Sequence, residues 1–370
     1  MSFVEQFSDL NRDALSMQLY STTAEQVEAA LINPRGDLTS LLALLSPAAE
    51  PYLEQMAQAS VALTRQRFGA ALNMYIPLYL SNLCANECDY CGFSMSNKLK
   101  RKTLTDDEIS AEVKAIKQLG YDSILLVSGE HETKVGVDYF VNALKIIKPH
   151  FNYLAMEVQP LATDEYRQLK QQGLDAVMLY QETYQPQTYA QHHTRGKKRD
   201  FANRLSAPER VAEAGVDKIG LGVLLGLDDW RLDALMMGHQ LSYLEQKYWR
   251  SRYSISLPRL RPCTGGITPK TMLTDRGLLQ MIFAFRLFNH ELEISLSTRE
   301  TPALRDKLFA LGVTHLSAGS STQPGGYANQ QRQLDQFEIS DDRSPSQIAN
   351  VIRSLGLTPV WKDWQGQWSC

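Results

Sequence analysis

Three of the five cysteines in this sequence, Cys84, Cys88 and Cys91, lie within eight residues in the spacing C-x3-C-x2-C. A compact loop with this spacing can direct three thiolates onto one metal cluster. It offers no fourth thiolate, so one iron of a four-iron cluster would stay open to another ligand. The alternative is a structural zinc site, but such sites normally complete a shell of four nitrogen or sulfur ligands. Since no further Cys or His lies nearby in the sequence, the motif favours an iron–sulfur cluster.

The cysteines directly follow an apolar run at residues 72–80, which we expect to form a strand. Seven more short apolar runs follow, separated by amphipathic segments with helical periodicity. The runs span 123–127, 153–158, 176–180, 218–224, 253–257, 292–296 and 313–316. The helical segments span 106–119, 138–148, 164–171, 232–248, 275–288 and 303–310. Strands that alternate with helices and lack hairpin turns predict an α/β fold, a parallel (β/α)8 barrel of the TIM type.

The segments on either side of the barrel differ from it in pattern. Residues 1–70 have apolar side chains at helix-like spacings and predict an N-terminal helical extension, and residues 71–330 form the barrel. Residues 331–370 are predicted to be a short C-terminal segment that packs on the barrel, with one helix at 346–355. Trp361, Trp364 and Trp368 are typical of side chains that tie a tail to the body of a protein.

The composition is that of an ordinary globular protein, with 44% hydrophobic and 21% charged residues. The 38 Lys and Arg residues against 41 Asp and Glu residues give a net charge of −3, which does not favour nucleic acid or an anionic membrane as partner. The start has no signal-peptide pattern, and no apolar run approaches the roughly 20 residues of a membrane span. Five unevenly spaced cysteines are too few for a disulfide framework. We therefore expect a protein of the reducing cytoplasm.

Polar residues collect just after the predicted strands, where the chemistry of a parallel barrel takes place. The positions, in chain order, are Glu130, Glu157, Gln181, Glu182, Arg259, Ser297, Thr298, Arg299 and the serines between 317 and 321. Because the carboxyl ends of all eight strands meet at one end of a barrel, we expect these side chains to line one mouth together with the cysteine loop.

The cysteine motif carries an aromatic residue, Tyr90, directly before its last cysteine, and in this form resembles the signature of the radical S-adenosylmethionine (SAM) superfamily. Other segments resemble the aromatic amino acid lyase branch of that superfamily, and together they cover almost the whole chain. They lie at 77–82, 129–130, 156–160, 180–184, 258–262, 296–300 and 322–327. Within the branch, the similarity is to the tyrosine lyases of thiamine thiazole biosynthesis.

The resemblance implies a 4Fe-4S cluster on Cys84, Cys88 and Cys91, with SAM bound at the fourth iron. It implies cleavage of the Cα–Cβ bond of L-tyrosine to 2-iminoacetate (dehydroglycine) and p-cresol, with methionine and 5′-deoxyadenosine as co-products. A sister lyase for tryptophan or another tyrosine-derived substrate is the alternative. A relative in hydrogenase maturation carries a second cluster on a C-terminal cysteine triad, and Cys370, the one cysteine in this tail, disfavours that relative.

The resemblance also suggests roles for individual residues. Tyr90 and Glu130 match positions close to SAM, and Glu157, Gln181 and Glu182 match positions that hydrogen-bond its ribose or methionine part. Arg259 is our choice for the tyrosine carboxylate, because a guanidinium fork matches a carboxylate. Tyr79 would orient the amino end of the substrate, and Ser297, Thr298 and Arg299 are weaker candidates, since Arg299 and Glu300 could pair with each other.

Two basic segments, 98–102 and 192–199, and the chemistry of the product suggest partners. The segment 192–199, with Arg195 and Arg199, is either a solvated loop or a contact for SAM or an acidic electron carrier. A flavodoxin- or ferredoxin-type electron donor and a complex with thiazole synthase are expected, since 2-iminoacetate hydrolyses readily and benefits from direct transfer. The alternative of a different class is a non-catalytic, zinc-bearing scaffold protein.

Overall fold

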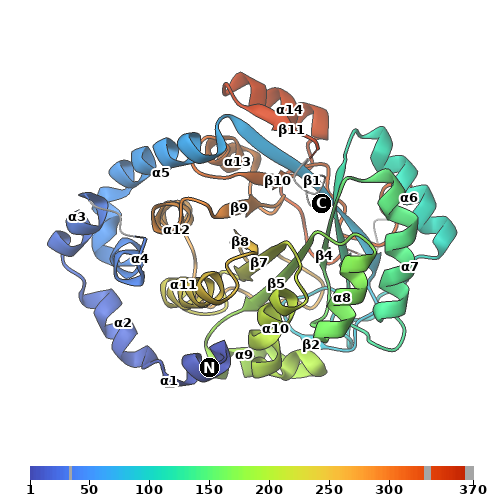
Figure 1. The fold of residues 1–370 in the computed structure, drawn as a ribbon, viewed down its shortest axis with the longest axis horizontal. Coiled ribbons are helices and arrows are strands. Elements are labelled where there is room, and N and C mark those ends of the chain that lie inside the picture. Colours follow the sequence, from blue (N-terminus) through green and yellow to red (C-terminus); the bar gives the residue numbers. More distant parts are fainter. Residues whose placement is uncertain (33–35, 329–334, 363–370) are drawn as a thin grey trace.

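The computed structural model describes residues 1–32, 36–328 and 335–362, and eight parallel strands in these ranges form a closed barrel (Figure 1). The strands are β1 (Ala71–Ser81), β3 (Ser123–Ser128), β4 (Tyr153–Glu157), β5 (Ala176–Glu182), β7 (Lys218–Val223), β8 (Arg252–Ser256), β9 (Glu293–Leu296) and β10 (His315–Ser317). The first and last strands pair directly, with Asn73 of β1 opposite His315 of β10. The predicted parallel (β/α)8 barrel is confirmed.

Helices between successive strands cover the outside of the barrel (Figure 1). They are α6 (Asp106–Gln118), α7 (Val137–Ile147), α8 (Thr163–Gln171), α9 (Pro186–His192), α10 (Phe201–Glu213), α11 (Trp230–Lys247), α12 (Asp275–Phe288) and α13 (Pro302–Leu308). At the start of α6, the Thr105 hydroxyl accepts from the Glu108 N–H, and the Glu108 carboxylate accepts from the Thr105 N–H. This capping box satisfies two N–H groups that a helix start leaves free. None of the helices in the described ranges has both the length and the apolarity that a membrane span requires.

The N-terminal extension is helical, as predicted, and curves around the outer faces of α11 and α12 (Figure 1). Its helices are α1 (Phe3–Asp9), α2 (Arg12–Ser21), α3 (Ala24–Ile32), α4 (Leu38–Leu45) and α5 (Leu53–Phe68). The side chains of Arg231 and Gln280, on α11 and α12, donate to the carbonyls of Leu44, Leu45 and Ser46. These carbonyls lie at the C-terminal end of α4 and have no partner within the helix. Side chains of the barrel helices therefore cap α4 and hold the extension in place.

The C-terminal segment adds α14 (Pro345–Ser354) and a short strand, β11 (Thr358–Val360), which pairs with β1 outside the barrel. The helix was predicted and the strand was not, because three residues are too few to show a strand pattern. Trp361 packs edge-on against Tyr121 at 5.2 Å between ring centres, as expected of a side chain that ties down a tail. Trp364, Trp368 and Cys370 lie outside the described residues.

A second, two-stranded sheet joins the cysteine loop to the loop after β5. Strand β2 (Glu87–Cys88) pairs antiparallel with β6 (His193–Arg195), with Cys88 opposite His193. The sequence contains no sign of this pairing, because both strands are very short and lie more than 100 residues apart. The ribbon brings the basic segment onto the cysteine motif.

A fully buried ion pair attaches the C-terminal segment to the barrel. Arg305, on α13, donates to the carboxylate of Asp341 and to the carbonyl of Ser317 at the end of β10. Both side chains of the pair are 0% exposed. A buried arginine that loses its carboxylate keeps the cost of its desolvation.

We therefore expect Asp341→Ala to lower the free energy of unfolding by about 3 kcal/mol, because it leaves the Arg305 charge buried without compensation. Urea denaturation followed by circular dichroism measures the change. Asp342→Ala is the matched control, because the neighbouring side chain is exposed. Equal stability of the two variants would contradict the assigned role of the pair.

Candidate active site

The cysteine loop between β1 and α6 is held in shape by Arg101, which lies outside the motif. Its guanidinium donates to four carbonyls of the loop, those of Asn82 (2.8 Å), Phe93 (2.7 Å), Ser94 (2.6 Å) and Asn97 (3.3 Å). Carbonyls in an irregular loop have no ladder of partners and need such donors when they are removed from water. The positions of the three thiols therefore depend on a side chain ten residues beyond the last cysteine.

Cys84, Cys88 and Cys91 all border one cavity. Burial raises the pKa of all three thiols, that of Cys84 to about 11. Ligation of iron requires thiolates, so loading a cluster releases these protons. In the described part of the chain, no three His, Cys, Asp or Glu side chains lie close enough to hold a single metal ion. Three thiols that open onto one shared space fit a 4Fe-4S cluster, and they do not form the closed shell of a structural zinc site.

The cavity lies inside the barrel mouth, at the carboxyl ends of the strands. Most residues that the sequence singled out line it. They are the three cysteines, Tyr79, Tyr90, Glu130, Glu157, Glu182, Ser297, Thr298 and Arg299. The structure thus brings together side chains from the ends of β1, β3, β4, β5 and β9.

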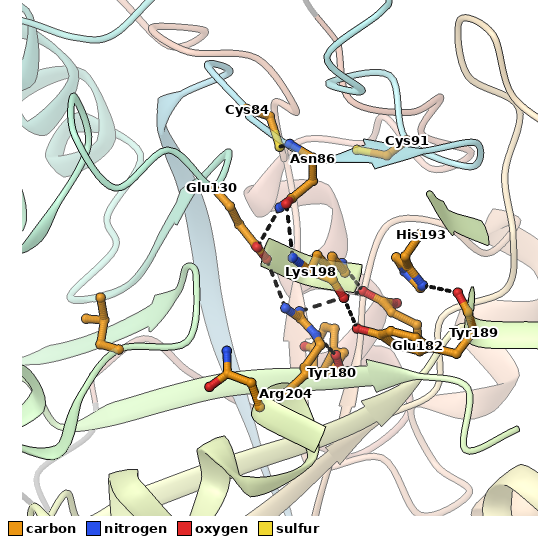
Figure 2. Close-up of polar contacts among 12 residues, drawn as sticks. Cys84, Asn86, Cys91, Glu130, Tyr180, Glu182, Tyr189, His193, Lys198 and Arg204 are labelled. Carbon is orange, nitrogen blue, oxygen red and sulfur yellow. Dashed lines mark hydrogen bonds and ion pairs between the residues drawn. The ribbon is translucent and has the colours of Figure 1, made fainter. Parts of the chain in front are cut away.

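Buried charges form one wall of the cavity (Figure 2). Arg204, on α10, lies 2.9 Å from the Glu130 carboxylate and 3.9 Å from that of Glu182, and Lys198 lies 2.7 Å from Glu182. The Asn86 amide, in the cysteine loop, donates to Glu130 at 2.7 Å and accepts from the Lys198 N–H at 3.0 Å. Burial alone would raise the pKa of both carboxylates, but Arg204 and Lys198 outweigh it and lower them. Both acids are therefore ionised at neutral pH.

A histidine fixes the aromatic residue of the cysteine motif. The Nδ1 of His193 is 2.7 Å from the Tyr189 carbonyl, which can only accept, so Nδ1 carries the proton. The Nε2 atom then accepts from the Tyr90 hydroxyl at 2.5 Å. Burial lowers the pKa of His193 to about 2, which keeps the ring neutral. Tyr90, between Cys88 and Cys91, is thereby anchored to β6.

Gln181 does not reach the cavity. Tyr180 and Glu182 of β5 line it, and the side chain between them in a strand points to the opposite face. The Gln181 amide nitrogen is buried without a hydrogen-bond partner. At the cavity, its neighbour Tyr180 occupies the position that the sequence suggested for Gln181. Among the described residues, Glu182 is the one non-glycine residue with a positive φ, which is 70°.

Arg259, chosen from the sequence for the tyrosine carboxylate, is bound by two carboxylates of the chain itself. Its guanidinium donates to both carboxylate oxygens of Glu300 and, at 2.8 Å, to Asp275. It is absent from the cavity lining, and its ion pairs hold it to Asp275 at the start of α12 and to Glu300 just before α13. The alternative pairing of Arg299 with Glu300 is wrong, because Glu300 pairs with Arg259.

Arg299 and Glu157 are the charged side chains that the cavity leaves unpaired within the described ranges. The Arg299 guanidinium lies 3.5 Å from the centre of the Phe337 ring and donates to the Arg259 carbonyl at 3.4 Å, with no carboxylate in ion-pair distance. Glu157 has no hydrogen-bond partner there. Burial, reinforced by the neighbouring Glu182 charge, raises the pKa of Glu157 to about 7. A free guanidinium and a free carboxyl group in one cavity are complementary to the two charges of an amino acid.

Comparisons with known proteins agree with this geometry. Residues 78–237 match the radical SAM superfamily model, and residues 256–358 match the Biotin and Thiamin Synthesis associated domain. The chain is 53% identical over 364 residues to 2-iminoacetate synthase of Escherichia coli K12, covering 98% of this chain and 97% of that protein. The chain belongs to the 2-iminoacetate synthase family. The enzyme of the same name from Salmonella typhimurium is 51% identical with the same coverage.

The fold of this family member is also that of a solved hydrogenase maturase. The crystal structure of HydG, a maturase of the FeFe-hydrogenase, superposes with a TM-score of 0.88 at 29% identity, over 99% of this chain and 80% of that chain. The radical SAM match spans the cysteine loop, the charged wall and α10, and the family assignment rests on the identity over almost the whole chain.

Arg204, Gln336 and Phe337 line this family member's cavity and were missed from the sequence. Lys198 stands in a basic run that favoured a solvated loop over a contact for SAM, but its side chain is only 11% exposed, whereas Lys197 and Arg199 on either side are exposed. Arg204 gives no local signal, because its partners lie on two strands far away in sequence. Gln336 and Phe337 belong to a polar tail and line the cavity only because the tail crosses its mouth.

Arg101→Ala should fold normally but hold less than half of the roughly four irons of the wild type after anaerobic reconstitution, because the cysteine loop loses four hydrogen bonds. Circular dichroism and iron and sulfide analysis measure the two properties. Lys100→Ala, which removes an exposed charge one residue away, should load iron like the wild type. Full iron content in Arg101→Ala would contradict the role of Arg101 in holding the cysteine loop.

Proposed function

We propose that this protein is a radical SAM lyase that cleaves L-tyrosine at Cα–Cβ. The products are 2-iminoacetate and p-cresol, with methionine and 5′-deoxyadenosine from SAM, and 2-iminoacetate supplies the thiazole moiety of thiamine. The observation that carries the proposal is the single cavity that joins three cysteine thiols to the unpaired Arg299 and Glu157. The two relatives named for forming 2-iminoacetate support this reaction over that of a sister lyase for tryptophan or a tyrosine-derived substrate.

The cofactors of the proposal are a 4Fe-4S cluster on the three cysteines and SAM. When bound, the cluster supplies the electron that cleaves SAM and so starts the radical reaction. Glu130 and Glu182 keep acceptor sites beyond their ion pairs, because each carboxylate has about four lone-pair directions, and these suit the amino group and ribose hydroxyls of SAM. Lys198 and Arg204 supply cations for its carboxylate. Gln181 drops out of this set, because its side chain leaves the cavity.

The substrate would bind through its two charges. A guanidinium donates two parallel hydrogen bonds to a carboxylate, so Arg299 holds the tyrosine carboxylate in place of Arg259. Glu157 accepts from the ammonium group, a role that replaces the contact to SAM suggested by the sequence. Tyr79 and Ser297, which also line the cavity, supply hydroxyls. Both charged groups on Cα would thereby be held, next to the bond that breaks.

We expect the apolar part of the cavity lining to keep water away from the reacting bond. Tyr79, Phe93, Leu125 and Val127 form one buried apolar cluster beside Cys84 and Cys91. A carbon radical abstracts hydrogen from any accessible C–H or solvent molecule, so enclosure is a requirement of the reaction.

Partners follow from the chemistry of the product and of the electron. Thiazole synthase is proposed as the acceptor of 2-iminoacetate, because the free imine hydrolyses. A flavodoxin- or ferredoxin-type protein is proposed as the electron donor, and Arg195, Lys197 and Arg199, which are exposed beside the cysteine loop, suit an acidic carrier. An oxygen-labile cluster and the sparse cysteines support the reducing cytoplasm as the location.

Anaerobic incubation with SAM, dithionite and L-tyrosine tests the proposal, with products separated by chromatography. We expect p-cresol, 2-iminoacetate (as its hydrolysis product glyoxylate) and 5′-deoxyadenosine in equal amounts. The Arg299→Lys variant should raise KM for tyrosine by roughly tenfold or more, because the fork is lost. Formation of 5′-deoxyadenosine without p-cresol would contradict the substrate, and product from tryptophan instead would support the sister lyase. A colourless protein with one zinc would support the scaffold alternative.

Tyrosine binding should also depend on pH through Glu157. Its pKa of about 7 means that the carboxyl group is protonated below this pH and charged above it. Since the tyrosine ammonium stays charged throughout, Kd should fall as pH rises from about 6 to about 8 and then level off. Arg299, Lys198, Arg204 and Glu182 face Glu157 and keep their charges over this range.

Isothermal titration of the cluster-loaded protein with tyrosine, without SAM, measures this dependence. Glu157→Gln has the same shape and cannot ionise, so its Kd should be higher and independent of pH. The same slope in Glu157→Gln as in the wild type would assign the titration to another group.

A further inference from the structure

Gln336 lines the cavity between the cysteine loop and Tyr79. Its carbonyl accepts from the Gly92 N–H at 2.9 Å, and its own N–H donates to the Thr322 carbonyl at 3.0 Å. The contact with Gly92 is close, because a Cβ there would lie 2.6 Å from the Gln336 carbonyl oxygen. The backbone at Gln336 is therefore held by the cysteine loop and by Thr322, which also lines the cavity.

The Gln336 side chain bridges two residues of the site. Its Oε1 is 2.7 Å from the Tyr79 hydroxyl, and its Nε2 is 3.6 Å from the sulfur of Cys91. Tyr79 is buried, with its ring edge-on to Phe93. A single amide thus connects a cysteine of the motif with the hydroxyl of a residue that lines the cavity.

A metal-bound Cys91 determines which way this amide and the hydroxyl point. A thiolate ligand only accepts, so the NH2 end of the amide must face the sulfur. The carbonyl end then faces Tyr79, whose O–H has to donate to it. The proton of Tyr79 is committed to Gln336, and the hydroxyl offers only lone pairs to the cavity.

We propose that Gln336 is a positioning residue that couples the cluster to the substrate site: it donates to the Cys91 sulfur and turns the Tyr79 hydroxyl into an acceptor for the substrate's N–H groups. The part concerning the substrate rests on the proposed function, and the part concerning Cys91 does not. Hydrogen bonds to cluster sulfurs stabilise the extra negative charge of the reduced state and raise its potential. Gln336 therefore acts on the cluster and on tyrosine through its two ends.

The test combines Gln336→Met, Tyr79→Phe and the double variant, each reconstituted anaerobically. Redox titration followed by electron paramagnetic resonance measures the cluster potential, and titration with tyrosine measures Kd. Gln336→Met should make the potential more negative, while Tyr79→Phe leaves it unchanged. Each single variant should weaken tyrosine binding roughly fivefold, the worth of one hydrogen bond. The double variant should bind no more weakly than Tyr79→Phe, because Gln336 acts on tyrosine through Tyr79.

Glu338→Gln is the matched control, since it changes an exposed side chain of the same segment and should leave both quantities unchanged. An unchanged potential in Gln336→Met, or additive losses of affinity in the double variant, would overturn the coupling. If the wild type fails to bind tyrosine, the proposed substrate is wrong, and the potential of Gln336→Met alone decides whether Gln336 acts on Cys91.

Discussion

Mutual neutralisation of four buried charges, Glu130, Glu182, Lys198 and Arg204, is the interaction on which the rest of the site depends. Each charge would be costly to bury alone, and each is compensated by a partner from a different element. Asn86 extends the set into the cysteine loop. The loop is thereby fixed to the ends of β3 and β5 and to α10 by the charges that would receive SAM. Cofactor site and barrel cannot be altered independently.

The fold was predictable because its signals are local and repeated. Eight apolar runs separated by helical segments leave few alternatives, and the rule that parallel strands end together then predicts a common mouth. This rule needs no knowledge of side-chain contacts, so it placed Glu130, Glu157, Glu182 and the cysteines correctly at the cavity. The rule could not tell which of two neighbouring residues in a strand faces the cavity. At the end of β5, Tyr180 and Glu182 line the cavity, whereas Gln181 between them is buried on the other face.

The roles of single charged residues were less predictable because they depend on partners distant in sequence. Arg259 and Arg299 both follow predicted strands, and by chemistry either suits a carboxylate. Glu300 decides between them by pairing with Arg259, 41 residues earlier, rather than with its neighbour. Lys198 likewise differs from the other basic residues of its run only through its burial against Glu182. These choices are made by three-dimensional packing, which a single sequence does not display.

The left-handed backbone at Glu182 has a consequence for the evolution of this protein. A residue with a Cβ in that conformation stores strain of about 1–3 kcal/mol, which glycine would relieve. Glycine would relax the backbone but would remove the carboxylate that neutralises Lys198, and the charged wall of the cavity would lose one of its ion pairs. Leaving Lys198 without this carboxylate costs about 3–5 kcal/mol, more than the strain that glycine relieves, so stability and the charged wall both keep a carboxylate at this position. Searches for stabilised forms of the enzyme will have to exempt it.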